Sequence, residues 1–439
     1  MTALESLAKS RPRGVRSLSR WLGITLAGGA VLAGATIFFA RRELRERVER
    51  ERELMANDRV APLTRVPLDG PDPSEWLEQI GLAAPTERAR VTSESCEIVK
   101  LSSAWTFFDF LGHIAHWIDR PEDAGDLRAC GLTFFRADLE LCRTQLELAR
   151  QVTGYGSRSA APPEPTFDGA TGEVTPPVTR GFLDCQRVLC ESAWVSAADG
   201  DGERAFADLR LAARALRTFD TSSSEFAATS VLEGRMTWLR TLSLVARELP
   251  GERTMLELDA IADEFEPWRD VERCWQSNRT AGLQEIQSRR RELEGSWEPG
   301  PLWLGTEAWL DHEETLFLES LRDTLGRARA HELRRPRPDH SIRPWEELSS
   351  RLAPDPFNLH YTAEDLESLL PVVRAFVLAR RDGAEAAIEW ASSTADPCGG
   401  QPLRTQFDGR TLMVWSLGLG STDEGGHPEL DAVLSLQKR

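Results

Sequence analysis

The chain has 439 residues and a formal net charge of −17 at pH 7. Residues 1–57 contain 11 basic and 6 acidic residues, so the rest of the chain contains 42 basic and 64 acidic residues. Such an acidic domain repels phosphate, which argues against nucleic acid or an anionic membrane surface as its partner. The length beyond residue 57 is enough for two or three folding units of typical size.

The stretch 21–40, WLGITLAGGAVLAGATIFFA, contains no charged or amide side chain. Its length lets a helix cross about 30 Å of hydrocarbon. A cleaved signal peptide is the alternative, because five basic residues precede the stretch. A signal peptide has a shorter apolar region and a small-residue cleavage site, whereas this stretch ends in two phenylalanines and an alanine and meets Arg41-Arg42. We therefore predict an uncleaved transmembrane helix.

The flanking charges bear on the orientation of this helix. Five basic residues precede it and six follow it within residues 41–52, so the positive-inside count alone does not decide. The basic residues that follow alternate with five glutamates, whereas those that precede are accompanied by Glu5 alone. We expect a single-pass protein of the inner (plasma) membrane, with a cytoplasmic N-terminus and an extracytoplasmic large domain.

Small residues recur four positions apart in the apolar stretch, at Gly29 with Ala33 and at Ala30 with Gly34. This spacing lets two membrane helices approach closely. A homodimer through this helix is one interpretation, and the ordinary small-residue content of a membrane helix is the other.

Residues 41–57 mix opposite charges, for example Glu43 with Arg47 and Glu46 with Arg50. Such pairs four positions apart stabilise an exposed helix, so we expect a charged, solvated stalk that continues from the membrane. Four prolines and Gly70 then predict an irregular linker up to residue 75.

The pattern between residues 76 and 394 is helical, with proline- and glycine-rich breaks at 154–180 and 334–358. The turn at 199–202, Asp-Gly-Asp-Gly between small residues, resembles that of a tetratricopeptide helical hairpin. It covers about one repeat, and no 34-residue period recurs, so we expect helical hairpins packed as an irregular array. The expected helices are 86–118, 126–152, 182–195, 205–216, 224–249, 252–265, 269–294, 306–333 and 362–391.

The chain has seven cysteines, none of them in a Cys-x-x-Cys pair or in a Cys/His cluster with zinc spacing. One to three disulfides would form in an oxidising compartment. Buried free thiols that pack as small apolar residues are the alternative.

The β signal is confined to the end of the chain. Asp408-Gly409 predicts a two-residue type I′ turn between strands at 403–407 and 410–416. A hairpin this short needs helices to cover one of its faces.

Two short motifs flank this hairpin: Asp-Pro-Cys-Gly-Gly-Gln-Pro-Leu at 396–403 and Val-Trp-Ser-Leu-Gly at 414–418. Together they resemble the C-terminal β region of the major pseudopilins of type II secretion, with Cys398 in place of that family's tryptophan. The resemblance covers residues 395–433 and implies an acidic loop that binds calcium. In this chain the implied ligands are Asp423, Glu424 and Asp431, supplemented by backbone carbonyls. A Gly-rich acidic turn without an ion is the alternative.

Asp109, His113 and His116 lie at i, i+4 and i+7 of an expected helix, so their side chains could face one way and hold a transition metal. Aromatic residues surround them, and no fourth ligand is visible in the sequence. Packed, hydrogen-bonded histidines are therefore the alternative.

The expected fold is mainly α, with an N-terminal transmembrane helix, an irregular α-helical array and a small C-terminal β-hairpin. No motif names a reaction, so an enzyme is not the favoured interpretation. The favoured function is a membrane-anchored scaffold that binds another protein of the cell envelope. The alternatives are an accessory component of a secretion or pilus system with a calcium-binding loop, and a hydrolase of envelope polymers.

The expected segments are a basic tail at 1–20, the membrane helix at 21–40, stalk and linker at 41–75, a helical region at 76–153, a loop at 154–180, a helical domain at 181–394 and the pseudopilin-like end at 395–439.

Overall fold

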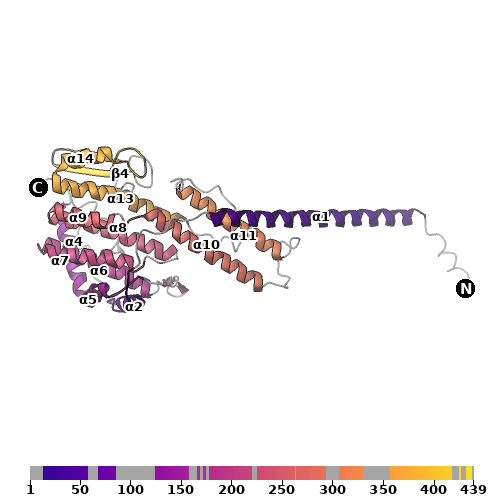
Figure 1. Ribbon diagram of the computed structural model, residues 1–439, viewed down its shortest axis with the longest axis horizontal. Coiled ribbons are helices and arrows are strands. Elements are labelled where there is room, and N and C mark those ends of the chain that lie inside the picture. Colours follow the sequence, from indigo (N-terminus) through magenta and orange to yellow (C-terminus); the bar gives the residue numbers. More distant parts are fainter. Residues whose placement is uncertain are drawn as a thin grey trace, which may run out of the picture. The chain divides into compact units, whose positions relative to one another are not determined.

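The computed structural model describes residues 13–57, 68–85, 124–157, 166–168, 172–174, 177–219, 225–262, 264–292, 306–329, 356–417, 425–426 and 432–437. These residues fall into two compact units (Figure 1). Unit 1 takes its described residues from 13–57, 279–292 and 306–323, and unit 2 takes the remainder. Most of the described chain is helical, as expected, and the strands are few and short.

Unit 1 combines α1 (Arg13–Asn57), α11 (Thr306–Arg329) up to residue 323 and the second half of α10 (Pro267–Glu292). Val48 and Met55 of α1 are buried. Charged residues of α1 form ion pairs with α11, namely Arg47 with Glu319, Glu51 with Arg322 and Arg52 with Glu314. The expected stalk at 41–57 is therefore helical, and most of its described side chains are exposed, as expected, whereas Val48, Glu51 and Met55 are buried within unit 1.

Among the described residues, no helix is both long enough and apolar enough to cross a membrane. Within the expected transmembrane stretch, the side chains of residues 21–24, 26, 27 and 30 lie outside the described part of the chain. The stretch belongs to α1, which continues without a break to Asn57.

The centre of unit 2 is α6 (Pro177–Ala198). Its neighbours come from both sides of it in the sequence: α2 (Ser74–Leu82), α4 (Ala124–Leu141), α5 (Arg143–Ala149), α7 (Gly202–Arg217) and α8 (Glu225–Glu248). Large apolar side chains of α6 are fully buried, among them Phe182, Leu189 and Trp194. Nearly every residue of α6 after Arg180 is buried, charged side chains included, which fits a helix with neighbours on several sides (Figure 1).

Two glycines let α2 and α6 approach closely. A Cβ added at Gly181 would lie 1.7 Å from the carbonyl oxygen of Leu77, and one at Gly81 would lie 2.5 Å from that of Pro177. No side chain fits at either position. The packing of α2 on the core therefore depends on these two residues.

Two expected helices are each divided. The segment 126–152 forms α4, α5 and the 3-10 helix η3 (Arg150–Gly154), with a break at Cys142. The segment 362–391 forms α13 (Pro356–Asp382) and α14 (Ala384–Ser393), because Gly383 between them has a φ of +98°. The expected helices after residue 180, from α6 to α11 and including α9 (Gly251–Ala262), are confirmed, while 86–118 lies outside the described residues.

The C-terminal region forms a three-stranded antiparallel sheet in the order β3 (Arg404–Phe407), β4 (Thr411–Ser416), β5 (Ala432–Gln437). The expected hairpin is present, but the prediction of two strands is wrong, because β5 pairs with β4 over its whole length. The connection from β3 to β4 has three residues instead of two, since the Asp408 carboxylate accepts hydrogen bonds from the backbone N–H groups of Arg410 and Thr411 at 2.8 and 2.6 Å. As expected, a helix covers the sheet, since α13 packs against β4 and β5.

A second, smaller hairpin interrupts the loop at 154–180. β1 (Thr166–Asp168) pairs with β2 (Gly172–Val174) in antiparallel register. The expectation that β structure is confined to the end of the chain is therefore wrong. The two strands have three residues each, too short to show apolar alternation in the sequence.

Both interpretations of the cysteines are realised. Cys130 is disulfide-bonded. The other five described cysteines are free thiols, of which only Cys398 is partly exposed: Cys142, Cys185, Cys190, Cys274 and Cys398. The seventh, Cys96, lies outside the described residues.

Candidate functional site

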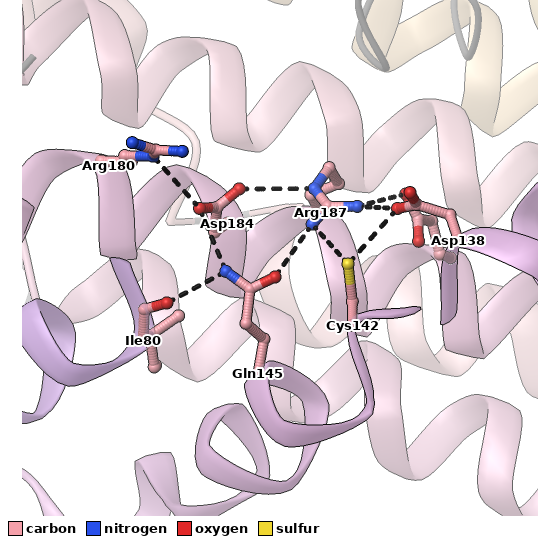
Figure 2. A network of polar contacts seen from close by, with 8 residues as sticks. Ile80, Asp138, Cys142, Gln145, Arg180, Asp184 and Arg187 are labelled. Carbon is pink, nitrogen blue, oxygen red and sulfur yellow. Dashed lines mark hydrogen bonds and ion pairs between the residues drawn. The ribbon is translucent and has the colours of Figure 1, made fainter. Parts of the chain in front are cut away.

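A buried network of charged groups is centred on Arg187 of α6 (Figure 2). The guanidinium forms ion pairs with three carboxylates: Asp138 of α4, and Asp184 and Glu191 one turn away on α6. It also donates hydrogen bonds to Gln145 Oε1 at 3.2 Å and to Cys142 Sγ at 3.3 Å. The side chains of Arg187 and of the three carboxylates are each at most 5 % exposed.

Gln145 of α5 extends this network to the neighbouring helices. Its amide nitrogen donates to the carbonyl oxygen of Ile80 on α2 at 2.9 Å and to Asp184 Oδ2 at 3.2 Å, as Figure 2 shows. At the edge of the network, Arg180 lies 3.9 Å from Asp184. The network thus ties α2, α4 and α5 to α6.

Burial sets the protonation of the network. It raises the pKa of Glu191 to about 8, and the neighbouring Asp138 adds to this effect while Arg187 opposes it. Burial also raises the pKa of the Cys142 thiol to about 11, although Arg187 lies beside it. Burial therefore favours the uncharged forms of Glu191 and Cys142, although both lie beside the guanidinium of Arg187.

A second ion pair binds η3 and α7 to α6. Arg150 donates to both carboxylate oxygens of Asp208, at 3.0 and 2.8 Å, and Ser192 Oγ donates to Asp208 at 2.6 Å. Asp208 is buried. The network is almost fully buried, although Glu191 Oε2 has no hydrogen-bond partner among the described residues, and it acts with the Arg150–Asp208 ion pair as a structural cross-link.

The described part of unit 2 also holds a cavity of about 390 Å³, in the size range of sites for small ligands and side chains. It lies where the turn before α10 and the first turn of α10 meet α13 and the turn that follows α14. Several lining residues are only half-buried, so the cavity opens to the surface. Its apolar walls include Phe265, Trp268, Leu366, Leu370 and Pro371.

The polar groups at this cavity are few and mostly acidic. Trp268 Nε1 donates a hydrogen bond of 2.6 Å to Glu367 Oε2, while Glu266 forms an ion pair of 3.0 Å with Arg269. Pro371 lies inside α13 and has no N–H to offer the carbonyl oxygen of Glu367, four positions earlier. Two carboxylates and the carbonyl oxygen of Glu367 are therefore among the hydrogen-bond acceptors at the cavity.

One wall of the cavity is supported from behind by Arg235 of α8, which is 2 % exposed. Its guanidinium forms an ion pair with Asp270 in the first turn of α10 and lies 5.7 Å from the ring centroid of Phe265. Trp238 packs edge-on against the same ring at 6.0 Å. The turn that lines the cavity is thus held in place by buried groups.

Asp396, the aspartate of the first C-terminal motif, is buried and joins both motifs. Its carboxylate accepts hydrogen bonds from Ser416 Oγ at 2.6 Å and from the backbone N–H groups of Leu417 and Cys398, both at 2.9 Å. The turn that begins at Asp396 is thereby fixed to the end of β4. The two segments that carry the pseudopilin resemblance are in direct contact.

The metal ligands expected from the sequence cannot be placed. Asp423, Glu424 and Asp431 lie outside the described residues, as do Asp109, His113 and His116. In the part of the chain that the structure does describe, no group of three or more His, Cys, Asp or Glu side chains is arranged to hold a metal ion.

Neither the Arg187 network nor the cavity is predicted from the sequence. The network has a local signal, because Asp184, Arg187 and Glu191 are spaced three and four positions apart on an expected helix. The cavity has a weaker one, Pro371 inside an otherwise helical pattern. Its walls come from three separate segments, which no local pattern brings together.

Comparison of the chain with protein-family models, with curated proteins and with solved structures finds no match.

Proposed function

We propose that the chain is a single-pass protein of the cell envelope, anchored in the inner (plasma) membrane by residues 21–40, whose helical units bind another envelope protein outside the cytoplasm. The main support for this proposal is that several large apolar side chains of α1 are exposed. Val31 and Leu32 are 71 % and 70 % exposed, and Phe38 and Phe39 are both 64 % exposed. Water is an unfavourable environment for several large apolar side chains exposed on one helix, so they call for a membrane or a partner.

Two further observations support membrane insertion rather than packing within the chain. A Cβ added at Gly28, Gly29 or Gly34 would meet no atom within 4 Å, so the helix surface is open at these three positions. The proposal also takes the remaining side chains of 21–40 from the sequence, where none is charged. Together they give the roughly twenty apolar residues that a membrane helix needs.

The disulfide at Cys130 supports the extracytoplasmic orientation. Disulfides persist in oxidising compartments and are rare in the cytosol. The acid excess of the chain beyond residue 57 and its cavity support binding of a protein rather than of nucleic acid.

Extraction of membranes tests the anchor. The full chain should stay in the pellet after alkaline carbonate treatment and enter solution only with detergent. A variant with Leu32→Arg and Ile37→Arg should be released by carbonate, because charges at mid-membrane are costly. The matched control, Leu54→Arg with Leu256→Arg, places the same charges on exposed apolar positions outside 21–40 and should stay in the pellet. Release of the unaltered chain by carbonate would contradict the proposal.

A second candidate function is an accessory role in a secretion or pilus system, favoured by the contact of Asp396 with Ser416 and Leu417. Calcium binding at the loop between β4 and β5 would belong to this role. Calcium at about 1 mM, the range of extracellular sites, should then raise the melting temperature of the purified chain, and Asp423→Asn should abolish the shift. Equal melting temperatures in calcium and in chelator would exclude the calcium site.

A further inference from the structure

The cavity of unit 2 has the chemical character of a recognition site. Its walls are apolar and aromatic, and its charged residues are two carboxylates, Glu266 and Glu367, against one guanidinium, Arg269. Arg269 is already paired with Glu266, which leaves the charge of Glu367 uncompensated by a cation among the described contacts. Those contacts use Oε2 of Glu367, leaving Oε1 to accept a further hydrogen bond.

The backbone at this place adds a further acceptor. The carbonyl oxygen of Glu367 does not receive the usual hydrogen bond from the residue four positions later, because that residue is Pro371. A ligand that fits must therefore supply hydrogen-bond donors and positive charge at Glu367. It must also supply apolar surface to the ring of Trp268 and to the side chains of Leu370 and Pro371, which are half-buried.

We propose that this cavity docks a segment of a partner protein that carries an arginine or lysine beside apolar side chains. A basic side chain meets both requirements, because its stem is apolar and its head donates hydrogen bonds to carboxylate and carbonyl oxygens. The chain beyond residue 57, with its 22-charge excess of acid, would also attract a basic partner at long range. The inference rests on the proposed function and deepens it, since it names the site and the class of partner.

Fluorescence anisotropy of labelled peptides on the full chain in detergent tests the docking site. The probe is a capped hexapeptide Gly-Leu-Arg-Leu-Gly-Gly, and the matched peptides carry glutamate or norleucine in place of arginine. The arginine peptide should bind at least about tenfold more tightly than either, and the difference should shrink as salt rises. Equal binding of the three peptides, or tighter binding of the glutamate or norleucine peptide, would overturn the proposal.

Two variants locate the binding. Glu367→Gln keeps an oxygen that accepts the hydrogen bond from Trp268 but removes the charge. It should weaken binding of the arginine peptide about fivefold to tenfold and leave the affinity for the norleucine peptide unchanged. Leu370→Arg changes a half-buried residue of the cavity wall and should weaken binding of all three peptides. Glu389→Gln removes an exposed carboxylate of α14 and should change nothing. Unaltered affinity of the arginine peptide for Glu367→Gln would place its binding elsewhere.

The outcomes separate this inference from the proposed function. If the chain resists carbonate extraction but does not prefer the arginine peptide, the docking site is contradicted and the membrane anchor stands. If the arginine peptide binds at the cavity but carbonate releases the chain, the membrane anchor is contradicted and the docking site stands. If an envelope protein co-purifies equally with the unaltered chain and with Glu367→Gln, the scaffold role stands and its interface lies outside this cavity, which also overturns the inference.

Discussion

Trp268 of α10 donates a 2.6 Å hydrogen bond to Glu367 of α13, a residue 99 positions further along the chain. This bond joins two walls of the cavity in unit 2 and occupies one oxygen of Glu367 while its charge remains. α13 also contains Pro371, which has no backbone N–H and so removes a hydrogen-bond donor one turn after Glu367. The cavity therefore combines apolar walls with two carboxylates, and the proposal of a basic partner rests on this combination.

The protonation of Glu191 predicts a fall of stability with rising pH. Its pKa is about 8 in the folded chain and close to 4.5 when exposed, so the folded state holds a proton that the unfolded state loses between these values. The free energy of unfolding should therefore decrease from about pH 5 to pH 8, by at most about 1.4 kcal/mol per unit, and level off above. Urea denaturation across this range measures the slope.

Glu191→Gln isolates that contribution. Glutamine resembles the protonated acid and cannot lose a proton, so the variant should show a shallower slope between pH 5 and pH 8. Glu78→Gln, on an exposed position of α2, should keep the slope of the unaltered chain. Identical slopes for Glu191→Gln and the unaltered chain would show that Glu191 is ionised at neutral pH.

Arg187→Met should destabilise unit 2 strongly. Asp138 and Asp184 would remain buried without their guanidinium, and loss of one partner from a buried ion pair costs about 3–5 kcal/mol. Arg143→Met removes an exposed arginine paired with Glu140 and should cost less than about 1 kcal/mol. Chemical denaturation compares the two, and a similar small loss for both would mean that Arg187 is not a structural cross-link.

Gly181→Ala should disturb the contact of α2 with α6. The added Cβ would lie 1.7 Å from the Leu77 carbonyl oxygen, so the helices must separate, at a cost of about 3 kcal/mol by analogy with overpacked cores. Gly154→Ala introduces the same methyl group where no atom lies within 4 Å, and should change stability by about 0.5 kcal/mol or less. Equal melting temperatures for the two variants would contradict the packing described.

The disulfide at Cys130 should appear in peptide maps of the chain alkylated in intact cells. Five cysteines are free, so the cross-linked peptide should contain Cys130 and Cys96, the one remaining cysteine of the sequence. Both should become alkylated only after reduction, whereas Cys398 should react without it once the chain is unfolded. Alkylation of Cys130 without reductant would remove the disulfide argument for an oxidising compartment.

Much of the fold follows from local pattern. The helices from α6 to α11 lie where apolar spacing places them, and Asp408-Gly409 marks a real chain reversal. The errors arise where tertiary structure decides. Glu51 is buried because a distant helix supplies Arg322, which no charge pattern within 41–57 can show. β5 is a strand because β4 offers it an edge, and this long-range pairing is not visible in the residues of β5 alone.

The candidate site was less accessible from sequence than the fold. The metal ligands expected from spacing fall on residues that the structure does not describe, so they stay predictions. The cavity depends on the position of Phe265 and Trp268 relative to Leu366 and Pro397, which are set by packing and not by spacing. Long-range juxtaposition of this kind requires the three-dimensional structure.

Sided labelling in intact cells tests the central claim, a membrane anchor with the helical units outside the cytoplasm, most directly. In a Cys398→Ser background, a membrane-impermeant maleimide should react with Ser392→Cys, an exposed position of α14, without permeabilisation. It should react with Ser6→Cys, in the basic N-terminal tail, only after the membrane is opened. The reverse pattern, or protection of both positions until the cells are permeabilised, would contradict the account.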